Sequence, residues 1–248
     1  MGNTLITGAT DGIGLALARY YAQQGERLIL IGRRERATLD GAFFTAERYC
    51  QADLARADCA QIIADCLEAQ GINTLDRLIH NAGIGYFGAI ADQTPEQIET
   101  VLAVNLRAPV LLTHRLLPHV RDASGQIVLI SSVVASLPAP EYAVYAASKA
   151  ALDEFGDNLR IELQGTGVAV QVIHPGATRT AMHSKIGIPP ERMDTRRFPT
   201  PERVAEQIAE AIASRTPQRT LGIGNRLMRI AGKHIAGLID FVMKRRAS

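Results

Sequence analysis

Tyr145 and Lys149 lie four residues apart in a segment whose pattern predicts a helix over residues 143–164. Residues at this spacing project from the same side of a helix. A phenol has an ordinary pKa near ~10, which is too high for ready proton exchange at neutral pH. A neighbouring ammonium stabilises the phenolate and lowers that pKa. The pair is therefore a candidate for acid–base chemistry, with Tyr145 carrying the proton and Lys149 adjusting its acidity.

Two more polar residues could complete such a site. Ser132 lies thirteen residues before Tyr145, at the end of a predicted strand, where its hydroxyl would hold a substrate oxygen beside the phenol. Asn105 lies in a predicted helix. Lys149 is the only lysine among the first 184 residues, which suits a site that needs a compact ammonium. The alternative, a surface Tyr–Lys pair on an alanine-rich helix, is disfavoured by the presence of Ser132 and Asn105.

Three neighbouring residues have suitable chemistry but the wrong position. Ser131 is expected to face the opposite side of its strand from Ser132. Ser148 adjoins Lys149 without the required spacing. Tyr142 has no lysine four residues later. We do not assign these three to the reacting group.

A Gly-rich turn, TGATDGIG, runs from Thr7 to Gly14 between a predicted strand and a predicted helix. Glycines permit a tight turn and let backbone N–H groups approach a pyrophosphate, whose charge the helix N-terminus favours. The alternative is that the glycines only pack the helix closely on the strand. The strand–turn–helix context favours dinucleotide binding. The candidate binding residues in the turn are Gly8, Thr10, Asp11, Gly12, Ile13 and Gly14.

Short apolar runs alternate with helix-like patterns along the chain. Strands are predicted over residues 4–7, 27–31, 49–52, 75–80, 126–131, 168–174 and 220–223, and helices over 13–24, 54–70, 95–120 and 143–164. Apolar runs without polar alternation suit strands that are covered on both faces. The pattern predicts an α/β fold: a single Rossmann-like, doubly wound parallel sheet flanked by helices. In such sheets ligands bind beyond the carboxyl ends of the strands, where the motifs fall.

Composition narrows the class of protein. The chain has 248 residues, 47% of them hydrophobic and 21% charged, which fits one globular domain. We expect neither a spanning helix nor a signal peptide. Three cysteines without metal-like spacing indicate reduced thiols in a cytoplasmic protein. Two of the six histidines, His80 and His174, end predicted strands, and the other four show no ligand pairing with acids or cysteines, so we predict no metal site and no Ser-His-Asp hydrolase. No basic face for nucleic acid is indicated.

Five separated motifs carry a resemblance to a known family. They are Thr7–Gly14, Asp53-Leu54, the run from His80 to Gly83 (HNAG), the set Asn105, Ser132, Tyr145 and Lys149, and Pro175-Gly176 followed by Thr180. From residue 2 to about residue 224 the chain resembles the short-chain dehydrogenase/reductase family, in its branch of roughly 250 residues. The glycine spacing, G-x-x-x-G-x-G, is typical of that family.

The resemblance implies a nicotinamide dinucleotide cofactor and assigns roles by position. The oxidised cofactor's positive ring would also lower the pKa of Tyr145, and Lys149 would bond the nicotinamide ribose. Asn105 would anchor a water that relays protons from the lysine. Asp53 and Leu54 would face the adenine, and Asn81, Ala82 and Gly83 would line the cofactor, with His80 standing where the family more often has Asn. The nicotinamide carboxamide would be held by Pro175, Gly176, Thr178 and Thr180.

The end of the second predicted strand indicates which dinucleotide is bound. An NAD enzyme would place an acid there to accept from the ribose 2′-hydroxyl, whereas this chain has Arg33 and Arg34. Guanidinium groups can bind a 2′-phosphate through paired hydrogen bonds, so NADP(H) is favoured over NAD(H). Asp11 argues the other way, because many NADP-preferring relatives carry a basic residue at that position. Asp11 can instead cap the first helix.

We interpret residues 1–225 as the dinucleotide-binding catalytic domain, with a substrate lid over about 181–199. The lid mixes apolar and basic residues, which suits a lipophilic carbonyl substrate, with or without an anionic group. The alternative is an ordinary solvated loop. The predicted activity is NADPH-dependent carbonyl reduction. The alternatives are an NAD-dependent alcohol dehydrogenase and a nucleotide-binding redox sensor without turnover.

Residues 226–248 form a separate tail, predicted as a basic amphipathic helix. It carries six cationic residues and one anionic residue, Asp240. Packing on the body or on a second subunit is one interpretation, and peripheral contact with a membrane surface is the other. Relatives commonly dimerise through the helices that here would span 107–120 and 143–164, so we expect a homodimer and leave a tetramer open.

Overall fold

The protein is built on a seven-stranded parallel sheet. The computed structural model describes residues 2–185, 187–188 and 194–234. The strand order is β3-β2-β1-β4-β5-β6-β7, and every pairing is parallel. The strands are β1 (Asn3–Thr7), β2 (Arg27–Gly32), β3 (Tyr49–Gln51), β4 (Arg77–His80), β5 (Gln126–Ile130), β6 (Ala169–His174) and β7 (Gln218–Thr220). The predicted Rossmann-like fold is confirmed.

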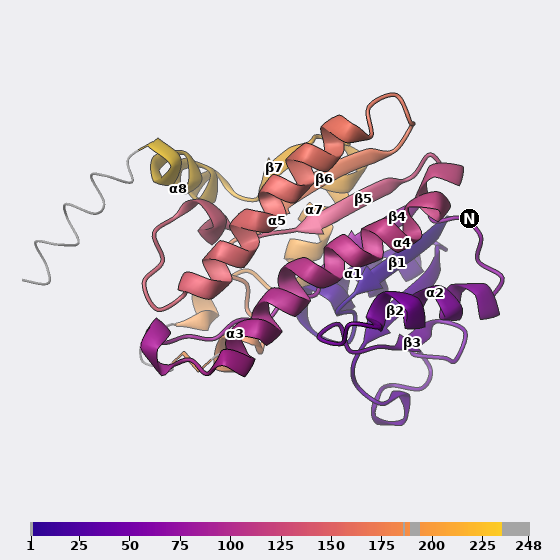
Figure 1. The fold of residues 1–248 in the computed structure, drawn as a ribbon, viewed down its shortest axis with the longest axis horizontal. Helices are drawn as coiled ribbons and strands as arrows, with labels where there is room; N and C mark the ends of the chain where they lie inside the picture. Colours follow the sequence, from indigo (N-terminus) through magenta and orange to yellow (C-terminus); the bar gives the residue numbers. More distant parts are fainter. Residues whose placement is uncertain (1, 186, 189–193, 235–248) are drawn as a thin grey trace, which may run out of the picture.

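Helices cover both faces of this sheet (Figure 1). They are α1 (Gly12–Gln23), α2 (Cys59–Ala69), α3 (Pro95–Leu102), α4 (Ala108–Asp122), α5 (Ala143–Glu162), α6 (Met182–Lys185), α7 (Pro201–Ala213) and α8 (Ile223–His234). Among the described residues, no helix is both long enough and apolar enough to cross a bilayer.

Successive strand residues belong to two different cores. On β1, Leu5 packs in the cluster that includes residues of α2, α4 and α5, whereas Ile6 packs in the cluster built from α1 and α7. Because side chains alternate across a strand, a run of Leu and Ile fills both cores at once. Burying each such side chain contributes roughly 1.5–3 kcal/mol.

The sheet has a topological switch point between β1 and β4. The chain runs from β1 outward through β2 to β3, then crosses back to place β4 on the other side of β1. The loops that follow β1 and β4 therefore diverge and leave a crevice at the carboxyl ends of the strands. The Gly-rich turn follows β1, and the motif beginning at His80 lies at the end of β4.

The predicted helix over residues 95–120 is not a single α-helix. Its first part, α3, begins with a capping box between Thr94 and Gln97 and with Pro95 at its first position. A π-helical segment, Ala103–Arg107, then separates α3 from α4. A π-segment widens the helix by one residue and is frequent at functional sites. Asn105 lies in this segment.

The C-terminal edge of the sheet differs from the prediction. The strand predicted over 220–223 is instead β7, and it ends at Thr220. Gly222 has a φ of +85°, and α8 begins directly after it at Ile223. This conformation suits glycine and turns the chain out of the sheet. α8 therefore begins three residues before the predicted tail, and residues 235–248 of that tail lie outside the described part of the chain.

Candidate active site

The helix α5 places Tyr145 and Lys149 at the end of β5. The side chain of Tyr145 is hydrogen-bonded to that of Ser132, which is the second residue after the strand. Asn105 is brought in from the π-helical segment and lies close to Lys149, because a Cβ added at Gly83 would be 3.2 Å from Lys149 Nζ and 3.7 Å from Asn105 Oδ1. The structure thus places all four predicted catalytic residues around the same end of the sheet.

The direction of the pKa shift of Tyr145 differs from the expected one. Burial raises the pKa of the phenol above its ordinary value of 10.0, and the hydrogen bond with Ser132 acts in the opposite direction. Desolvation dominates because it penalises the phenolate. Burial thus outweighs the lowering expected from the neighbouring ammonium, and Lys149 is not among the causes of the shift.

Lys149 is almost completely buried, with an exposed fraction of 3%. Its ammonium donates a hydrogen bond of 2.9 Å to the carbonyl oxygen of Ile130, the last residue of β5. Burial lowers the pKa of Lys149 to about 8, and the charge of Asp153, one turn further along α5, opposes the shift. The contact with Ile130 fixes the ammonium beside the strand end that also leads to Ser132.

Asn105 is held by the main chain of Ile84. Its Oδ1 accepts from Ile84 N at 2.9 Å, and its Nδ2 donates to Ile84 O at 2.8 Å and to Ser148 Oγ at 3.0 Å. Ser148 in turn donates to the carbonyl oxygen of Tyr145 at 2.7 Å. We set Ser148 aside from the sequence, yet it links Asn105 to the helix that carries Tyr145. In the sequence, the position of Ser148 next to Lys149 is the one signal that could have indicated this role.

The other two neighbours have structural roles. Ser131 is buried and donates to the carbonyl oxygen of Lys149 at 3.3 Å, so it joins β5 to α5. The ring of Tyr142 lies 6.0 Å from that of Tyr145 and 5.3 Å from that of Phe87. Burial raises the pKa of Tyr142 to about 12.

Glycines in the turn after β1 are required by close contacts. Gly8 has a φ of +67°, and a Cβ there would lie 2.8 Å from Ala82 Cα. A Cβ at Gly14 would overlap the carbonyl oxygen of Gly8 and the side-chain amide of Asn81. The turn is therefore pressed against both the first turn of α1 and the loop after β4.

Replacing Gly14 with Ala is expected to destabilise the protein by about 1–3 kcal/mol, because the overlapping atoms are mostly backbone, and to abolish nucleotide binding by displacing the turn. Urea unfolding and fluorescence titration with NADPH measure the two effects. Gly41→Ala is the matched control, since a Cβ there meets no atom within 4 Å. Unchanged nucleotide affinity in Gly14→Ala would contradict the role given to this turn.

Side chains tie the turn to the loop after β4. Thr7 Oγ1 accepts from the backbone N–H groups of Asn81 and Ala82, both at 3.0 Å. Asn81 Nδ2 donates to the carbonyl oxygens of Thr7 at 3.0 Å and Gly8 at 3.3 Å. These bonds span the switch point, so the predicted cofactor residues of both loops form one rigid wall. Thr7 is a positioning residue that we had seen only as part of the motif.

The end of β2 lies against the same turn. A Cβ at Gly32 would be 2.6 Å from Thr10 Cγ2, which brings Arg33 and Arg34 next to the turn. Both arginines are exposed. The guanidinium of Arg34 donates to Thr38 O at 3.0 Å and so braces the loop that follows β2.

The predicted adenine residues follow β3. Asp53 Oδ1 accepts from Ala55 N at 3.0 Å, which closes the turn before α2, and Leu54 is buried. Because of this turn, the helix that we predicted to begin at residue 54 begins instead at Cys59, as α2.

Asp11 caps α1, as predicted, by accepting from Gly12 N at 2.7 Å. Its carboxylate also pairs with the ammonium of Lys185, at the end of α6. The hydrogen bond from Lys185 is the largest cause that lowers the pKa of Asp11, and the charge of Arg34 lowers it further. The negative charge next to the turn is therefore balanced by two cations from distant segments.

The segment after β6 approaches the same region. Pro175 O accepts from Val133 N at 3.2 Å, and Gly176 packs so closely on Asn225 that a side chain there would overlap it. Thr178 is buried and donates to Gly176 O at 3.1 Å. A Cβ at Gly12 would be 3.1 Å from Thr180 Cγ2. Thr180 thus lies at the Gly-rich turn.

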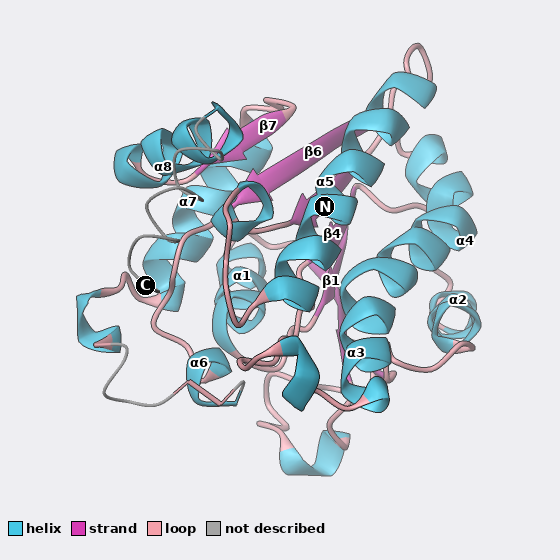
Figure 2. Ribbon diagram, turned by 60° about the vertical axis from the view of Figure 1, so that its left-hand side comes forward, coloured by secondary structure: helices cyan, strands magenta, loops and turns pink. Residues whose placement is uncertain are grey.

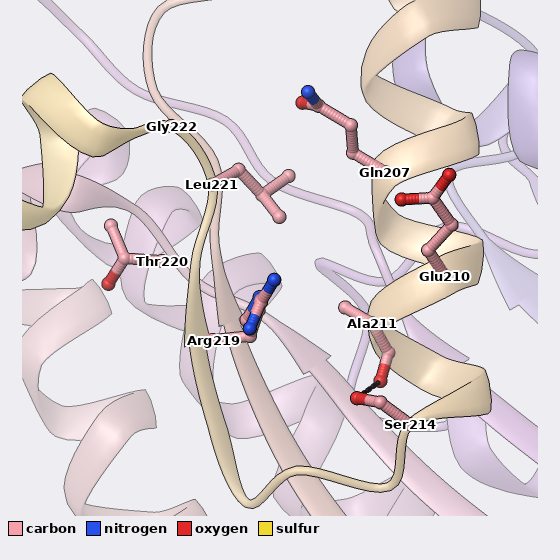
Figure 3. Close-up of a pocket in the computed structure, with 8 residues that line it drawn as sticks. All are labelled: Gln207, Glu210, Ala211, Ser214, Arg219, Thr220, Leu221 and Gly222. Atoms are coloured by element: carbon pink, nitrogen blue, oxygen red, sulfur yellow. Dashed lines mark hydrogen bonds between the residues drawn. The ribbon is translucent and has the colours of Figure 1, made fainter.

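A hollow of about 240 Å³ lies beside the Gly-rich turn, between α1, the segment around Thr180 and the start of α7, with Asp11, Gly12 and Thr180 among its lining residues. A second hollow, of about 170 Å³, lies between α7 and the β7 edge and is lined by Gln207, Glu210, Arg219 and neighbouring residues (Figure 3). None of the predicted catalytic or cofactor residues lines it. It is separate from the candidate active site.

Part of the predicted lid is described. Ile188 is buried, and Arg196 and Arg197 pair with Asp194 at 2.9 and 3.5 Å. Their charge is thus partly balanced within the lid. Residues 186 and 189–193 lie outside the described residues.

Two buried histidines end strands. His80 Nε2 is 3.0 Å from Thr113 Oγ1, and burial lowers its pKa to about 3, so it is neutral at physiological pH. His174 Nε2 is 2.9 Å from Asp153 Oδ2. Among the described residues no group of histidines, cysteines and acids is arranged to hold a metal ion.

Known proteins resemble this chain in sequence and in fold. The family model described as short chain dehydrogenase matches residues 3–190. A short chain dehydrogenase of Pseudocercospora fijiensis is 34% identical over 200 residues; the match covers 77% of this chain but only 63% of that protein. A sulfoacetaldehyde reductase of Chromohalobacter salexigens is 36% identical over 187 residues, covering 71% of this chain and 72% of that protein.

A solved structure extends the likeness to nearly the whole fold. A short-chain dehydrogenase from Sphingobium yanoikuyae, solved in complex with NADPH, has a TM-score of 0.78 at 26% identity, and the match covers 97% of this chain and 96% of that one. The match of the family model over most of the chain, together with these relatives, shows that the protein belongs to the short-chain dehydrogenase/reductase family of oxidoreductases.

Proposed function

We propose that the protein is an NADPH-dependent carbonyl reductase that acts on a lipophilic ketone or aldehyde, with Tyr145 as the general acid. The observation that carries the proposal is the hydrogen bond between the side chains of Tyr145 and Ser132, one helical turn from the buried ammonium of Lys149. A phenol and a hydroxyl held together can both bond to one carbonyl oxygen, the first donating the proton that the oxygen needs as its charge develops.

The residues present fit a dinucleotide. Gly8 and Gly14 allow the tight turn at the start of α1, where a pyrophosphate is favoured, and the lack of a side chain at Gly83 leaves space next to Lys149 Nζ. When bound, the reduced nucleotide supplies the hydride that adds to the carbonyl carbon. Lys149 would bond the nicotinamide ribose, and Asn105 would keep the loop at Ile84 in place through two hydrogen bonds.

The preference for NADP(H) rests on charge at the end of β2. Arg33 is exposed beside the turn, and the opposing charge of Asp11 is paired with Lys185. The two positions directly after Gly32, at the end of β2, hold Arg33 and Arg34 and not an acid that would accept from a ribose 2′-hydroxyl. A 2′-phosphate would therefore meet positive charge here.

Replacing Arg33 with Asp is expected to weaken NADPH binding about 10-fold or more while leaving NADH binding nearly unchanged, because a charge-assisted hydrogen bond contributes about 1.5–3 kcal/mol. Titration of intrinsic or nucleotide fluorescence gives both dissociation constants. Arg36→Asp makes the same charge change on an exposed residue further along the loop and serves as the control. Equal loss for both nucleotides, or tighter NADH than NADPH binding in the parent, would favour an NAD-dependent alcohol dehydrogenase.

Aromatic rings adjoin the proposed general acid. Phe87, Tyr142 and Tyr145 form a row of edge-to-face contacts that ends at the reacting phenol. This row supports a lipophilic carbonyl compound. A panel that compares aromatic and long-chain ketones and aldehydes with small anionic aldehydes, followed by NADPH absorbance, tests the substrate class. Tight nucleotide binding without oxidation of NADPH by any compound would instead favour the redox sensor.

We further propose a cytoplasmic homodimer formed through α4 and α5, on which Ala147 and Ala150 are exposed small residues that allow close approach. Sedimentation velocity of the parent and of Ala147→Arg tests the subunit contact. A monomeric parent would contradict it.

A further inference from the structure

The helix α8 is seated on the body of the protein by polar and small residues. Arg229 is buried, and its guanidinium donates to Asp153 Oδ2 on α5 at 3.3 Å. Gly232 packs directly on the carbonyl oxygen of Ser136, where any side chain would overlap it, and Asn225 packs on Gly176. These three contacts determine which side of α8 faces the protein.

The opposite side of α8 is apolar and exposed. Ile223, Leu227 and Ile230 recur at intervals of four and three residues and form one stripe, and Met228 is exposed outside that stripe. These four are among only seven large hydrophobic residues that are exposed in the described part of the chain. A surface helix ordinarily turns its apolar side inward. In α8 the arrangement is reversed, and Figure 2 shows this helix at the edge of the fold.

Positive charge borders this apolar stripe. Arg226 is exposed on α8 next to Leu227 and one turn before Ile230. Beyond His234 the sequence keeps the same helical spacing, with Leu238, Phe241 and Val242 continuing the apolar positions and Lys244 the cationic ones. An apolar stripe flanked by cations is the pattern of helices that lie in the interface of anionic bilayers.

We propose that α8 docks the protein on the surface of a membrane rich in anionic lipid. The stripe Ile223, Leu227 and Ile230 enters the interface, and the exposed Arg226 contacts the headgroups. A second copy is the weaker candidate for covering the stripe. Besides the buried Arg229, residues 226–248 carry five cations and one anion, so a two-fold contact would bring like charges together, and these oppose that association. This proposal does not depend on the proposed activity.

Co-sedimentation of the full chain with vesicles tests the proposal. We expect at least about 10-fold stronger binding to vesicles of phosphatidylcholine with phosphatidylglycerol than to phosphatidylcholine alone, and weaker binding as salt is raised. The double variant Leu227→Gln, Ile230→Gln should lose the binding, since these residues are 63% and 51% exposed. Arg226→Gln should weaken binding only where the anionic lipid is present.

The matched control is Ile90→Gln, Leu102→Gln, which removes two apolar residues that are 56% and 39% exposed elsewhere on the surface. It should bind vesicles like the parent. Unfolding midpoints of all variants show that they fold. If the parent fails to bind anionic vesicles, or if the Leu227, Ile230 variant binds as well as the parent, the proposal is wrong. If the parent does not bind vesicles and that variant also has a lower mass in sedimentation velocity, the stripe is a subunit contact instead.

Discussion

Tyr145→Phe is expected to lower kcat for NADPH-dependent carbonyl reduction by about 10³-fold, within the range that a general acid contributes. The variant removes only the hydroxyl that is hydrogen-bonded to Ser132 and keeps the ring packed against Tyr142 and Gly85. Nucleotide affinity and stability should therefore change little. The measurement is single-turnover oxidation of NADPH with a substrate that the parent reduces.

Tyr142→Phe is the matched control. Tyr142 lies one turn before Tyr145, and its ring is in edge-to-face contact with that of Tyr145. Removal of its hydroxyl should change kcat by no more than a few fold, since its pKa, raised to about 12 by burial, keeps it protonated. An unaltered rate in Tyr145→Phe would refute the proposed mechanism. A large loss of kcat in Tyr142→Phe would indicate that Tyr142, and not Tyr145, is the general acid.

Lys149→Met is expected to stabilise the nucleotide-free protein at pH 7 while it abolishes turnover. Burial lowers the pKa of Lys149 from 10.5 to about 8. A shift of this size corresponds to a cost of about 3 kcal/mol for keeping the ammonium inside at neutral pH. Met fills a similar volume without charge, which removes this cost. Loss of the hydrogen bond to Ile130 O destabilises the variant by about 1 kcal/mol and offsets part of the gain. The expected net gain is about 2 kcal/mol.

The pH dependence gives a sharper test of the same buried charge. Between pH 8 and 10.5 the unfolded chain keeps a proton on Lys149 that the folded chain has released. Stability contributed by this group therefore rises with pH across that window and is constant below it. Urea unfolding should show that the free energy of unfolding of the parent, relative to that of Lys149→Met, is higher at pH 10 than at pH 7. If the difference between the two proteins is the same at both pH values, Lys149 is not a buried charged group.

Much of the fold follows from local pattern. Apolar runs such as the one at β2 must be covered on both faces, so the alternation with helices already specified a parallel sheet. The ends of β1, β4, β5 and β6 could be located to within about two residues, and these ends carry the motifs. The edge strand β7 was misplaced because it has three residues and a pattern too short to separate from the turn at Gly222.

The sequence also identified the reacting side chains, because their spacing along α5 is a local property. Tyr145 and Lys149 share a helix face whatever the helix packs against. Their protonation depends on other segments. Burial by the surrounding fold reverses the expected pKa shift of Tyr145, and the carbonyl oxygen of Ile130 receives the ammonium of Lys149.

Contacts between distant segments explain the remainder. Ser148 became important because a π-helical turn brings Asn105 within hydrogen-bond distance of it, and Lys185 because it reaches Asp11 across 174 residues of sequence. Periodicity in the sequence predicted an apolar face on α8, but it did not indicate whether that face points toward the protein or toward solvent. The ion pair between Arg229 and Asp153 and the close packing of Gly232 turn the polar side inward, since a buried guanidinium needs its carboxylate partner. Local sequence thus specifies which groups are available, and the packing of remote elements sets their charge, their partners and their exposure.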